Sequence, residues 1–209
     1  RVVGYLSAAV YKEERENNRG GNMLDMKQRK RLLGIARDSI ATYLKSGKKP
    51  ELSEKDAKLL EECGVFVTLH MAGELRGCIG NLIGSGPLYL TVRDMAVESA
   101  VGDPRFIPLT SSELPGVEIE LSVLSPMRRV NSADEIDLGT HGVLVRKGLR
   151  SGVFLPQVAT ETGWSKEEFL SALCSQKAGL SPSAWREKDT ELYVFSAEVF
   201  SEKDPGLNE

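Results

Sequence analysis

Apolar residues recur every three or four positions between residues 25 and 44, as they do on one face of an amphipathic helix. Gly47 follows this stretch and is a typical signal for a helix end. The same spacing predicts a helix over residues 88–101, and a charged stretch between the two predicts a shorter helix over residues 54–62. Two long helices therefore frame the first half of the chain.

Apolar and polar residues alternate over residues 65–70 and again over 74–82, on both sides of a turn at residues 72–73. This pattern predicts a β-hairpin. Residues 117–123 show the clearest alternation in the chain, with Glu118 and Glu120 on the polar side. Further strands are expected over 142–145, 151–155 and 192–200, and further helices over 156–161 and 165–177. Because such tight hairpins leave no room for parallel crossovers, the fold class is α+β with a mostly antiparallel sheet.

The first 22 residues differ from the rest of the chain. A short apolar stretch is followed by a charged linker that ends in Gly20–Gly21–Asn22, and such a linker buries too little surface to order itself. We therefore expect the folded domain to start near Met23. Residues 203–209 are expected to form a disordered tail.

Net charge, the length of apolar stretches and the number of cysteines disfavour several classes of protein. The net charge of −3 disfavours nucleic acid as a partner, because phosphate backbones attract basic surfaces. No apolar stretch approaches the roughly 18 residues of a membrane helix, so we expect no membrane partner. The three cysteines are widely spaced and odd in number, which argues against a disulfide framework or a zinc ribbon. We expect a soluble, cytoplasmic protein.

The sequence Leu-Arg-Gly-Cys-Ile-Gly at residues 75–80 holds the strongest chemical candidate. Gly77 and Gly80 flank Cys78, and glycines in a strand often mark a bulge or the close approach of a ligand. Arg76, two residues before the cysteine on a strand, could share its face, lower the pKa of the thiol and hold an anion. The alternative is a small buried cysteine in a glycine-rich strand, with Arg76 paired to a carboxylate.

His141 lies between glycines just before a predicted strand and is the natural candidate for a base near neutral pH. A cysteine and a histidine that are distant in sequence can meet in space as a nucleophile and its base. Cys78 and His141 are therefore the candidate catalytic pair. The alternative for His141 is a turn residue with an unusual backbone conformation.

Other charged residues could complete a binding site. Glu118 and Glu120 could hold a cation or an arginine if their strand face lines a cleft, and are otherwise a solvated surface. Asp103 and Arg105 form a charged pair that also fits a structural turn, and Lys177 fits the cationic end of a helix. The sequence has no histidine spacing typical of metal ligands, such as HxxxH or HxH, and no phosphate-binding loop. We therefore predict neither a metal nor a cofactor.

Six blocks in order resemble the AMMECR domain, whose microbial members are called AmmeMemoRadiSam system protein A. The blocks are LRGCIG at 75–80, DPRFIPL at 103–109, EIELSVLSP at 118–126, THGV at 140–143, FLPQVA at 154–159 and KAGL at 177–180. The resemblance covers about residues 23–202. It implies two unequal subdomains, the larger with an antiparallel sheet flanked by helices, and a groove between them near which the motif residues gather.

The N-terminal stretch VVGYLSAA resembles the closing strand of the Memo family. This resemblance implies that residues 1–22 are the remnant of an upstream Memo-like domain plus a linker. Microbial members of the AMMECR family are associated with Memo and radical SAM proteins, which are therefore the expected protein partners.

Two functions follow from these observations. In the first, a groove binds a small polar or anionic molecule through Arg76, Gly77, Gly80, Asp103, Arg105, Glu118, Glu120 and Lys177, and a thiol-dependent step at Cys78 with His141 acts on it. In the second, the domain has no catalytic role and works in contact with a Memo-like or radical SAM protein. An accessible thiol beside a cation would favour the first function, and a buried, inert thiol the second.

Overall fold

The computed structural model describes residues 24–84 and 86–207. These residues form two compact units, a large unit of residues 24–124 and 198–207 and a small unit of residues 125–197. The expectation of two unequal subdomains is thus confirmed. The expected Memo-like remnant at residues 1–22 lies outside the described residues.

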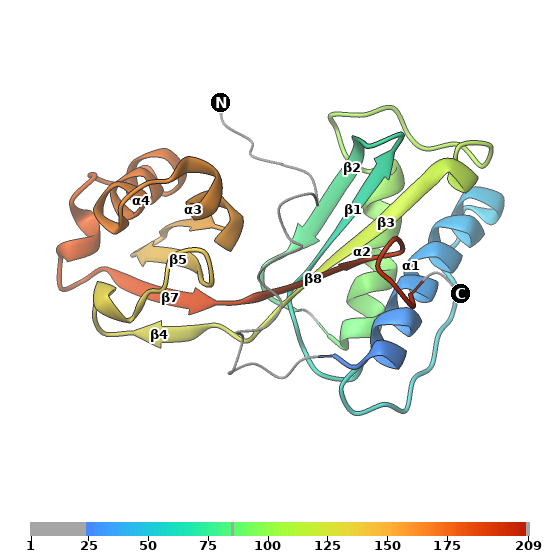
Figure 1. Ribbon diagram of the computed structural model, residues 1–209, viewed down its shortest axis with the longest axis horizontal. Helices are drawn as coiled ribbons and strands as arrows, with labels where there is room; N and C mark the ends of the chain where they lie inside the picture. The colour runs from blue at the N-terminus through green and yellow to red at the C-terminus, as the bar shows by residue number, and fades with distance from the viewer. Residues whose placement is uncertain (1–23, 85, 208–209) are drawn as a thin grey trace. The chain divides into compact units, whose positions relative to one another are not determined.

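The large unit is built on a four-stranded sheet with the order β2-β1-β3-β8 (Figure 1). The strands are β1 (Val65–Met71), β2 (Glu74–Asn81), β3 (Val117–Leu124) and β8 (Ala197–Ser201). Strand β1 pairs antiparallel with both β2 and β3. Helix α1 (Met26–Ser46) packs against β3 and against α2 (Leu88–Val101), which in turn lies on β1 and β2. A 3-10 turn, Leu114–Gly116, leads into β3.

The core of the large unit lies between this sheet and its two helices. Val65, Val67 and Leu69 of β1 alternate into it and are completely buried. They meet residues of β3, such as Ile119, and of α1, such as Leu32. The residues that alternate with them, Phe66, Thr68 and His70, lie on the other face of the sheet, because successive strand residues point to opposite faces.

Helix α1 begins and ends as the sequence predicts. Asp25 caps its first turn in a reciprocal capping box with Gln28, and Gly47 ends it in the left-handed conformation at φ 68°. The helix expected over residues 54–62 is wrong, and residues 57–60 form a turn instead. The carbonyl groups of Leu59 and Glu61 accept hydrogen bonds from the first amides of α2, so they are not available to continue a helix.

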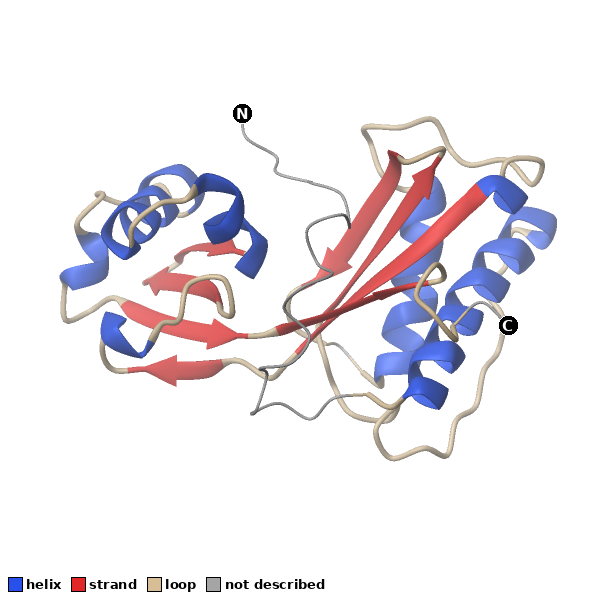
Figure 2. Cartoon of the chain, in the orientation of Figure 1, coloured by secondary structure: helices blue, strands red, loops and turns tan. Residues whose placement is uncertain are grey.

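The small unit has its own sheet, with the order β4-β7-β5-β6 and antiparallel pairing (Figure 2). The strands are β4 (Arg128–Val130), β5 (Gly142–Lys147), β6 (Arg150–Phe154) and β7 (Glu191–Phe195). Its helices are α3 (Pro156–Thr162), α4 (Lys166–Ala172), a π-helical turn (Leu173–Lys177) and 3-10 turns at Ala133–Glu135 and Ala184–Arg186. Phe169 and Leu173 are fully buried in a second core, which confirms the α+β class for this unit too.

The single strand expected over residues 192–200 is wrong. It divides into β7 and β8, which belong to different sheets. Between them, the amide of Ser196 donates to the hydroxyl of Ser125, and the amide of Ser125 donates to the carbonyl of Ser196, both at 2.9 Å. These two hydrogen bonds replace the regular hydrogen bonds between neighbouring strands at this point. The chain passes there from the sheet of the small unit to the sheet of the large unit.

Residues 203–207, which follow β8, are ordered and do not form the expected disordered tail. Leu207 is only 5% exposed and joins the core of the large unit. Lys203 forms an ion pair with Glu118, and the carboxylate of Asp204 accepts a hydrogen bond from the amide of Ser201. Burial of this leucine therefore orders the segment. Among the described residues, no helix is both long and apolar enough to span a bilayer.

Candidate functional site

The two glycines of the LRGCIG motif make room for protein, not for a ligand. A Cβ atom at Gly77 would lie 2.1 Å from the carbonyl oxygen of Ser99 on α2. A Cβ atom at Gly80 would lie 2.4 Å from the ring of Phe66 on β1. The expectation of close approach is confirmed, but the approaching groups are helix α2 and an aromatic ring.

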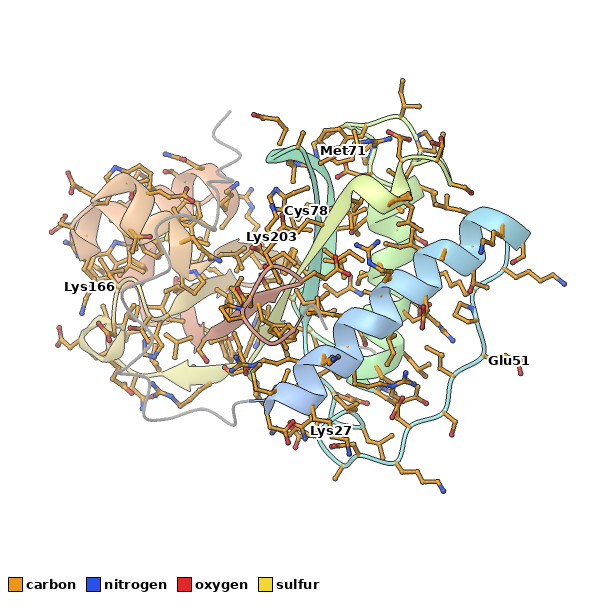
Figure 3. The ribbon with its side chains drawn as sticks, turned by 45° about the vertical axis from the view of Figure 1, so that its right-hand side comes forward. Lys27, Glu51, Met71, Cys78, Lys166 and Lys203 are labelled. Atoms are coloured by element: carbon orange, nitrogen blue, oxygen red, sulfur yellow. The ribbon has the colours of Figure 1, made fainter. Side chains whose placement is uncertain are left out.

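Cys78 lies on β2 and is 5% exposed (Figure 3). The hydroxyl of Thr68, its cross-strand partner on β1, donates to its sulfur at 3.4 Å. The prediction of a thiol that opens onto solvent is therefore wrong, and the alternative of a small buried cysteine is the one observed. Cys63 and Cys174 are buried as well, and burial raises the pKa of each of these two thiols.

Asp103 and Arg105 bind the backbone on both sides of Cys78. The amide of Cys78 donates to Oδ2 of Asp103 at 2.8 Å, and its carbonyl oxygen accepts from Nη2 of Arg105 at 3.1 Å. The two side chains also form a bidentate pair, at 2.9 Å and 2.7 Å. Because β2 is an edge strand, its outward backbone groups would otherwise lack partners in the sheet.

The carboxyl group of Asp103 is buried and ionised. Its side chain is 2% exposed, whereas that of Arg105 is 36% exposed. Hydrogen bonds from the Arg105 guanidinium, aided by those from two backbone amides, lower the pKa of Asp103 to about 2 against the cost of burial. This pair is a structural clamp that ties the loop after α2 to β2.

Arg76 ties the far end of the same loop to β2. Its Nε and Nη2 atoms donate to Glu113 at 3.1 to 3.3 Å, and Nη1 donates to the carbonyl oxygen of Ile107 at 2.9 Å. The pKa of Glu113 is lowered by hydrogen bonds from Thr110 and then by Arg76. Arg76 is thus paired with a carboxylate, as the alternative interpretation of the motif expected.

A pocket of about 460 Å³ lies between these arginines and the loop. Arg76, Arg105, Thr110 and Glu113 supply its polar atoms, and the rest of its wall is apolar: Phe106, Ile107 and Pro108. The guanidinium of Arg105 lies 5.5 Å from the centre of the Phe106 ring. Ile107 is 82% exposed although its loop is fixed at both ends. Cys78 is not among the residues that line this pocket.

The face of the sheet opposite the helices is polar. Register places Cys78, Thr68 and Glu120 in one row across β2, β1 and β3, and His70 opposite Glu118 in another. Burial, with the negative charges of Glu118 and Asp204, raises the pKa of Glu120 to about 7. Burial lowers the pKa of His70. We call Thr68, His70, Cys78, Glu118, Glu120 and Ser122 the polar face.

At one end of this face, a second pocket of about 390 Å³ is lined by residues that include His70, Glu118, Glu202 and Lys203. Glu202 is committed elsewhere, since its carboxylate is paired with Arg37 and accepts from the amide of Ile119. Within the described part of the chain, no three His, Cys, Asp or Glu side chains gather in a way that could hold a metal ion.

His141 and Lys177 belong to the small unit, so the predicted site residues are divided between the two units. Nδ1 of His141 accepts a hydrogen bond from the amide of Asp137 at 3.0 Å, which leaves Nε2 to carry the proton of the neutral ring. Burial lowers the pKa of His141. Lys177 is exposed, with its ammonium 5.8 Å from the centre of the Phe154 ring. The pairing of Cys78 with His141 stays a prediction.

Sequence reasoning missed residues that are far from the motif along the chain but contact it in the structure. The carbonyl oxygen of Ser99 lies against Gly77, and its hydroxyl donates a hydrogen bond to the carbonyl oxygen of Val67. Glu113 forms an ion pair with Arg76. Only the run Phe106-Ile107-Pro108, apolar residues in a predicted loop, carried a signal in the sequence.

The sequence profile of the AMMECR1 family matches residues 33–200, and this range contains the clamp, the pocket and the polar face. The chain belongs to the AMMECR1 family. The resemblance to the AMMECR domain is thereby confirmed. Protein MK0488 of Methanopyrus kandleri is 43% identical over 194 residues, which cover 88% of this chain and 93% of that protein. Protein PYRAB00100 of Pyrococcus abyssi is 42% identical over 185 residues, with coverage of 83% and 90%.

The crystal structure of the uncharacterised protein PH0010 from Pyrococcus horikoshii is similar to this AMMECR1 chain, with a TM-score of 0.72 and 41% identity. The match covers 84% of this chain and 92% of that one. The matches cover at least 90% of each of these three relatives, and the one with a solved structure has a similar fold.

Proposed function

We propose that this AMMECR1 domain binds a small anionic molecule with an apolar part, in the pocket lined by Arg76 and Arg105. The observation that carries the proposal is the lining itself, in which two fixed guanidinium groups stand beside Phe106, Ile107 and Pro108. A mostly apolar pocket of several hundred Å³ with a few convergent polar groups is the usual form of a small-molecule site. The proposal assigns binding, and no covalent step, to the region of Cys78, because that thiol is buried.

Glu113 indicates which anion suits the pocket. Its carboxylate already accepts hydrogen bonds from Arg76 in the fork geometry that guanidinium and carboxylate share. Glu113 is 29% exposed and belongs to the loop, so a ligand carboxylate or phosphate can compete with it for Arg76. The bound anion would then complete the pairing that Glu113 supplies in the free protein.

We expect 3-phenylpropionate to bind the full chain in isothermal titration calorimetry and its neutral analogue 3-phenylpropanol to bind at least about 10-fold more weakly, since hydrogen bonds to charged groups contribute about 1.5–3 kcal/mol. Arg76→Leu should weaken 3-phenylpropionate by a similar factor. Arg93→Leu is the matched control, because Arg93, like Arg76, is paired with a carboxylate of the large unit but does not line the pocket.

The variant Glu113→Gln separates recognition from loop anchoring. If the ligand competes with Glu113, removal of this charge strengthens binding of 3-phenylpropionate several-fold. If Glu113 only holds the loop in place, the same variant weakens binding. Equal affinity for the acid and the alcohol would contradict the proposal.

The second candidate function is docking of a protein partner, and the exposure of Ile107 favours it. An apolar side chain that is 82% exposed, on a loop held by Arg76 and by the clamp, is preorganised for contact. The partners that the family resemblance suggests are a Memo-like domain, fused upstream in this proposal, and a radical SAM protein. Such a role needs no chemistry at Cys78.

We expect Ile107→Asp to weaken binding of a purified Memo-like protein by about 10-fold or more in calorimetry, because truncation of a central interface anchor commonly costs about 2 kcal/mol. Leu149→Asp is the matched control. Leu149 is an exposed apolar residue as well, but it lies in the turn between β5 and β6. No difference between the two variants would count against docking at this loop.

A further inference from the structure

Each of the two guanidinium groups in the pocket of the proposed function is paired with a carboxylate. Arg76 forms an ion pair with Glu113, and Arg105 forms one with Asp103. The side chain of Asp103 is 2% exposed and fixed in the clamp, whereas that of Glu113 is 29% exposed and lines the pocket. An anion that binds Arg76 therefore comes to lie beside the charge of Glu113, and two negative charges so close together repel each other. A ligand that also carries a positive charge would remove this repulsion.

The two carboxylate oxygens of Glu113 have different partners. Oε2 accepts hydrogen bonds from the amide and the hydroxyl of Thr110, at 2.9 and 2.8 Å, and from Nη2 of Arg76 at 3.3 Å. Oε1 accepts from Nε and Nη2 of Arg76, at 3.2 and 3.1 Å. When a ligand carboxylate binds Arg76, the two bonds from Thr110 keep Glu113 at the wall of the pocket. Oε1 then becomes an acceptor for a donor on the same ligand.

We infer that the ligand is a free α-amino acid with an apolar side chain, an inference that rests on the proposed function. Its α-carboxylate takes the place of Glu113 on Arg76, and its α-ammonium donates to Oε1 of Glu113. An ammonium offers only donors and a carboxylate only acceptors, so both charges of the ligand and both charges of the protein are then paired. The two ligand groups share one carbon atom, which suits two protein groups that are in contact in the free protein.

The apolar wall of the pocket suits the side chain of such a ligand. This wall consists of Phe106, Ile107 and Pro108. Ile107 is 82% exposed, so an apolar side chain placed against it removes apolar surface of both partners from water. Its carbonyl oxygen accepts from Nη1 of Arg76 at 2.9 Å, which holds the guanidinium beside the wall. The pocket therefore favours apolar amino acids over polar ones.

Isothermal titration calorimetry on the full chain compares three ligands that share a benzyl group. L-Phenylalanine carries both charges, 3-phenylpropionate lacks the ammonium, and L-phenylalanine amide lacks the carboxylate. We expect L-phenylalanine to bind about 10-fold more tightly than either of the others, since each of them loses a hydrogen bond between charged groups. Equal or weaker binding of L-phenylalanine, with 3-phenylpropionate still bound, would overturn the inference and leave the proposed function intact. Absence of binding by all three would overturn both.

The variant Glu113→Gln tests the partner of the ammonium. It should reduce the preference for L-phenylalanine over 3-phenylpropionate from about 10-fold to less than about 3-fold, because an amide has no negative charge. Glu54→Gln is the matched control and should leave the preference unchanged, since Glu54 is also paired with an arginine of the large unit but does not line the pocket. A preference that survives Glu113→Gln would overturn the inference. The comparison of ligands on the wild-type protein decides it even where a variant fails to fold.

Discussion

We expect Gly77→Ala to destabilise the large unit by at least about 3 kcal/mol, near the upper end of overpacking effects. The added methyl group would lie 2.1 Å from the carbonyl oxygen of Ser99, a distance that real Cβ contacts do not reach. Both atoms belong to regular elements, β2 and α2, so relief requires the helix to move away from the sheet. The consequence is a loss of packing across the interface between α2 and the sheet.

Gly34→Ala is the matched control. Gly34 lies within α1, and a Cβ atom there meets nothing within 4 Å. Alanine is the better helix former, so this variant should stabilise the protein by about 0.5–1 kcal/mol. A Gly77→Ala protein that loses less than about 1 kcal/mol would show that the contact with Ser99 is not close in solution.

The stability of Gly77→Ala must be measured by a signal that comes from the large unit. Both tryptophans, Trp164 and Trp185, lie in the small unit, so tryptophan fluorescence follows the wrong part of the chain. Hydrogen exchange of the amides of β1 follows the large unit directly, and the amides of β5 provide an internal reference. For Gly77→Ala we expect faster exchange in β1 and little change in β5.

The second large effect is expected from Asp103→Asn, which should cost about 2–3 kcal/mol at neutral pH. The substitution replaces one carboxylate oxygen by an NH₂ group that faces Arg105, and it removes the negative charge that Asp103 contributes to their bidentate pair. It also weakens the acceptor that Cys78 uses for its amide. Partial exposure of Arg105 keeps the cost below that of a fully buried pair.

The pH dependence of this effect has a definite sign. The pKa of Asp103 is lowered to about 2 in the folded protein, whereas an unfolded aspartate titrates near 3.8. Its contribution is therefore complete above about pH 5 and is lost as the pH falls through 4 toward 2, because protonation then favours the unfolded chain. The difference in free energy of unfolding between wild type and Asp103→Asn should shrink over the same range.

Urea unfolding at pH 7 and pH 3, followed by the exchange of β1 amides, measures this difference. Asp94→Asn is the matched control, since Asp94 also pairs with an arginine of the large unit but is 35% exposed. We expect this control to cost no more than about 1 kcal/mol. A cost for Asp103→Asn that is equal at both pH values would mean that its charge does not contribute.

Local sequence patterns predicted the elements whose ends are set locally. Helix α1 has its capping residue Asp25 and its terminal Gly47 within its own sequence, and its observed bounds are close to the predicted ones. The helix predicted over residues 54–62 failed because its carbonyl groups bind the first turn of α2, some 30 residues later. The strand over 192–200 divides because of a serine 71 residues away.

The same distinction applies to the candidate site. The sequence singled out Arg76, Cys78, Asp103 and Arg105. Hydrogen bonds join the last three, and Arg76 lines a pocket together with Arg105. Their roles depended on partners that no local pattern indicates, such as Glu113 for Arg76 and Ser99 for Gly77. For this reason we propose ligand binding by the guanidinium groups of Arg76 and Arg105, and no chemical step at the thiol of Cys78.

The pair of reciprocal hydrogen bonds between Ser125 and Ser196 has a topological consequence. The chain enters the small unit at the first of these serines and leaves it at the second, so 72 consecutive residues start and finish at one point. The small unit has the form of a cassette inserted between β3 and β8 of a complete sheet-and-helix domain. Domains with adjacent termini are those that tolerate transfer into other loops, and this arrangement would allow the cassette to be gained, lost or exchanged without a change in the surrounding strand order.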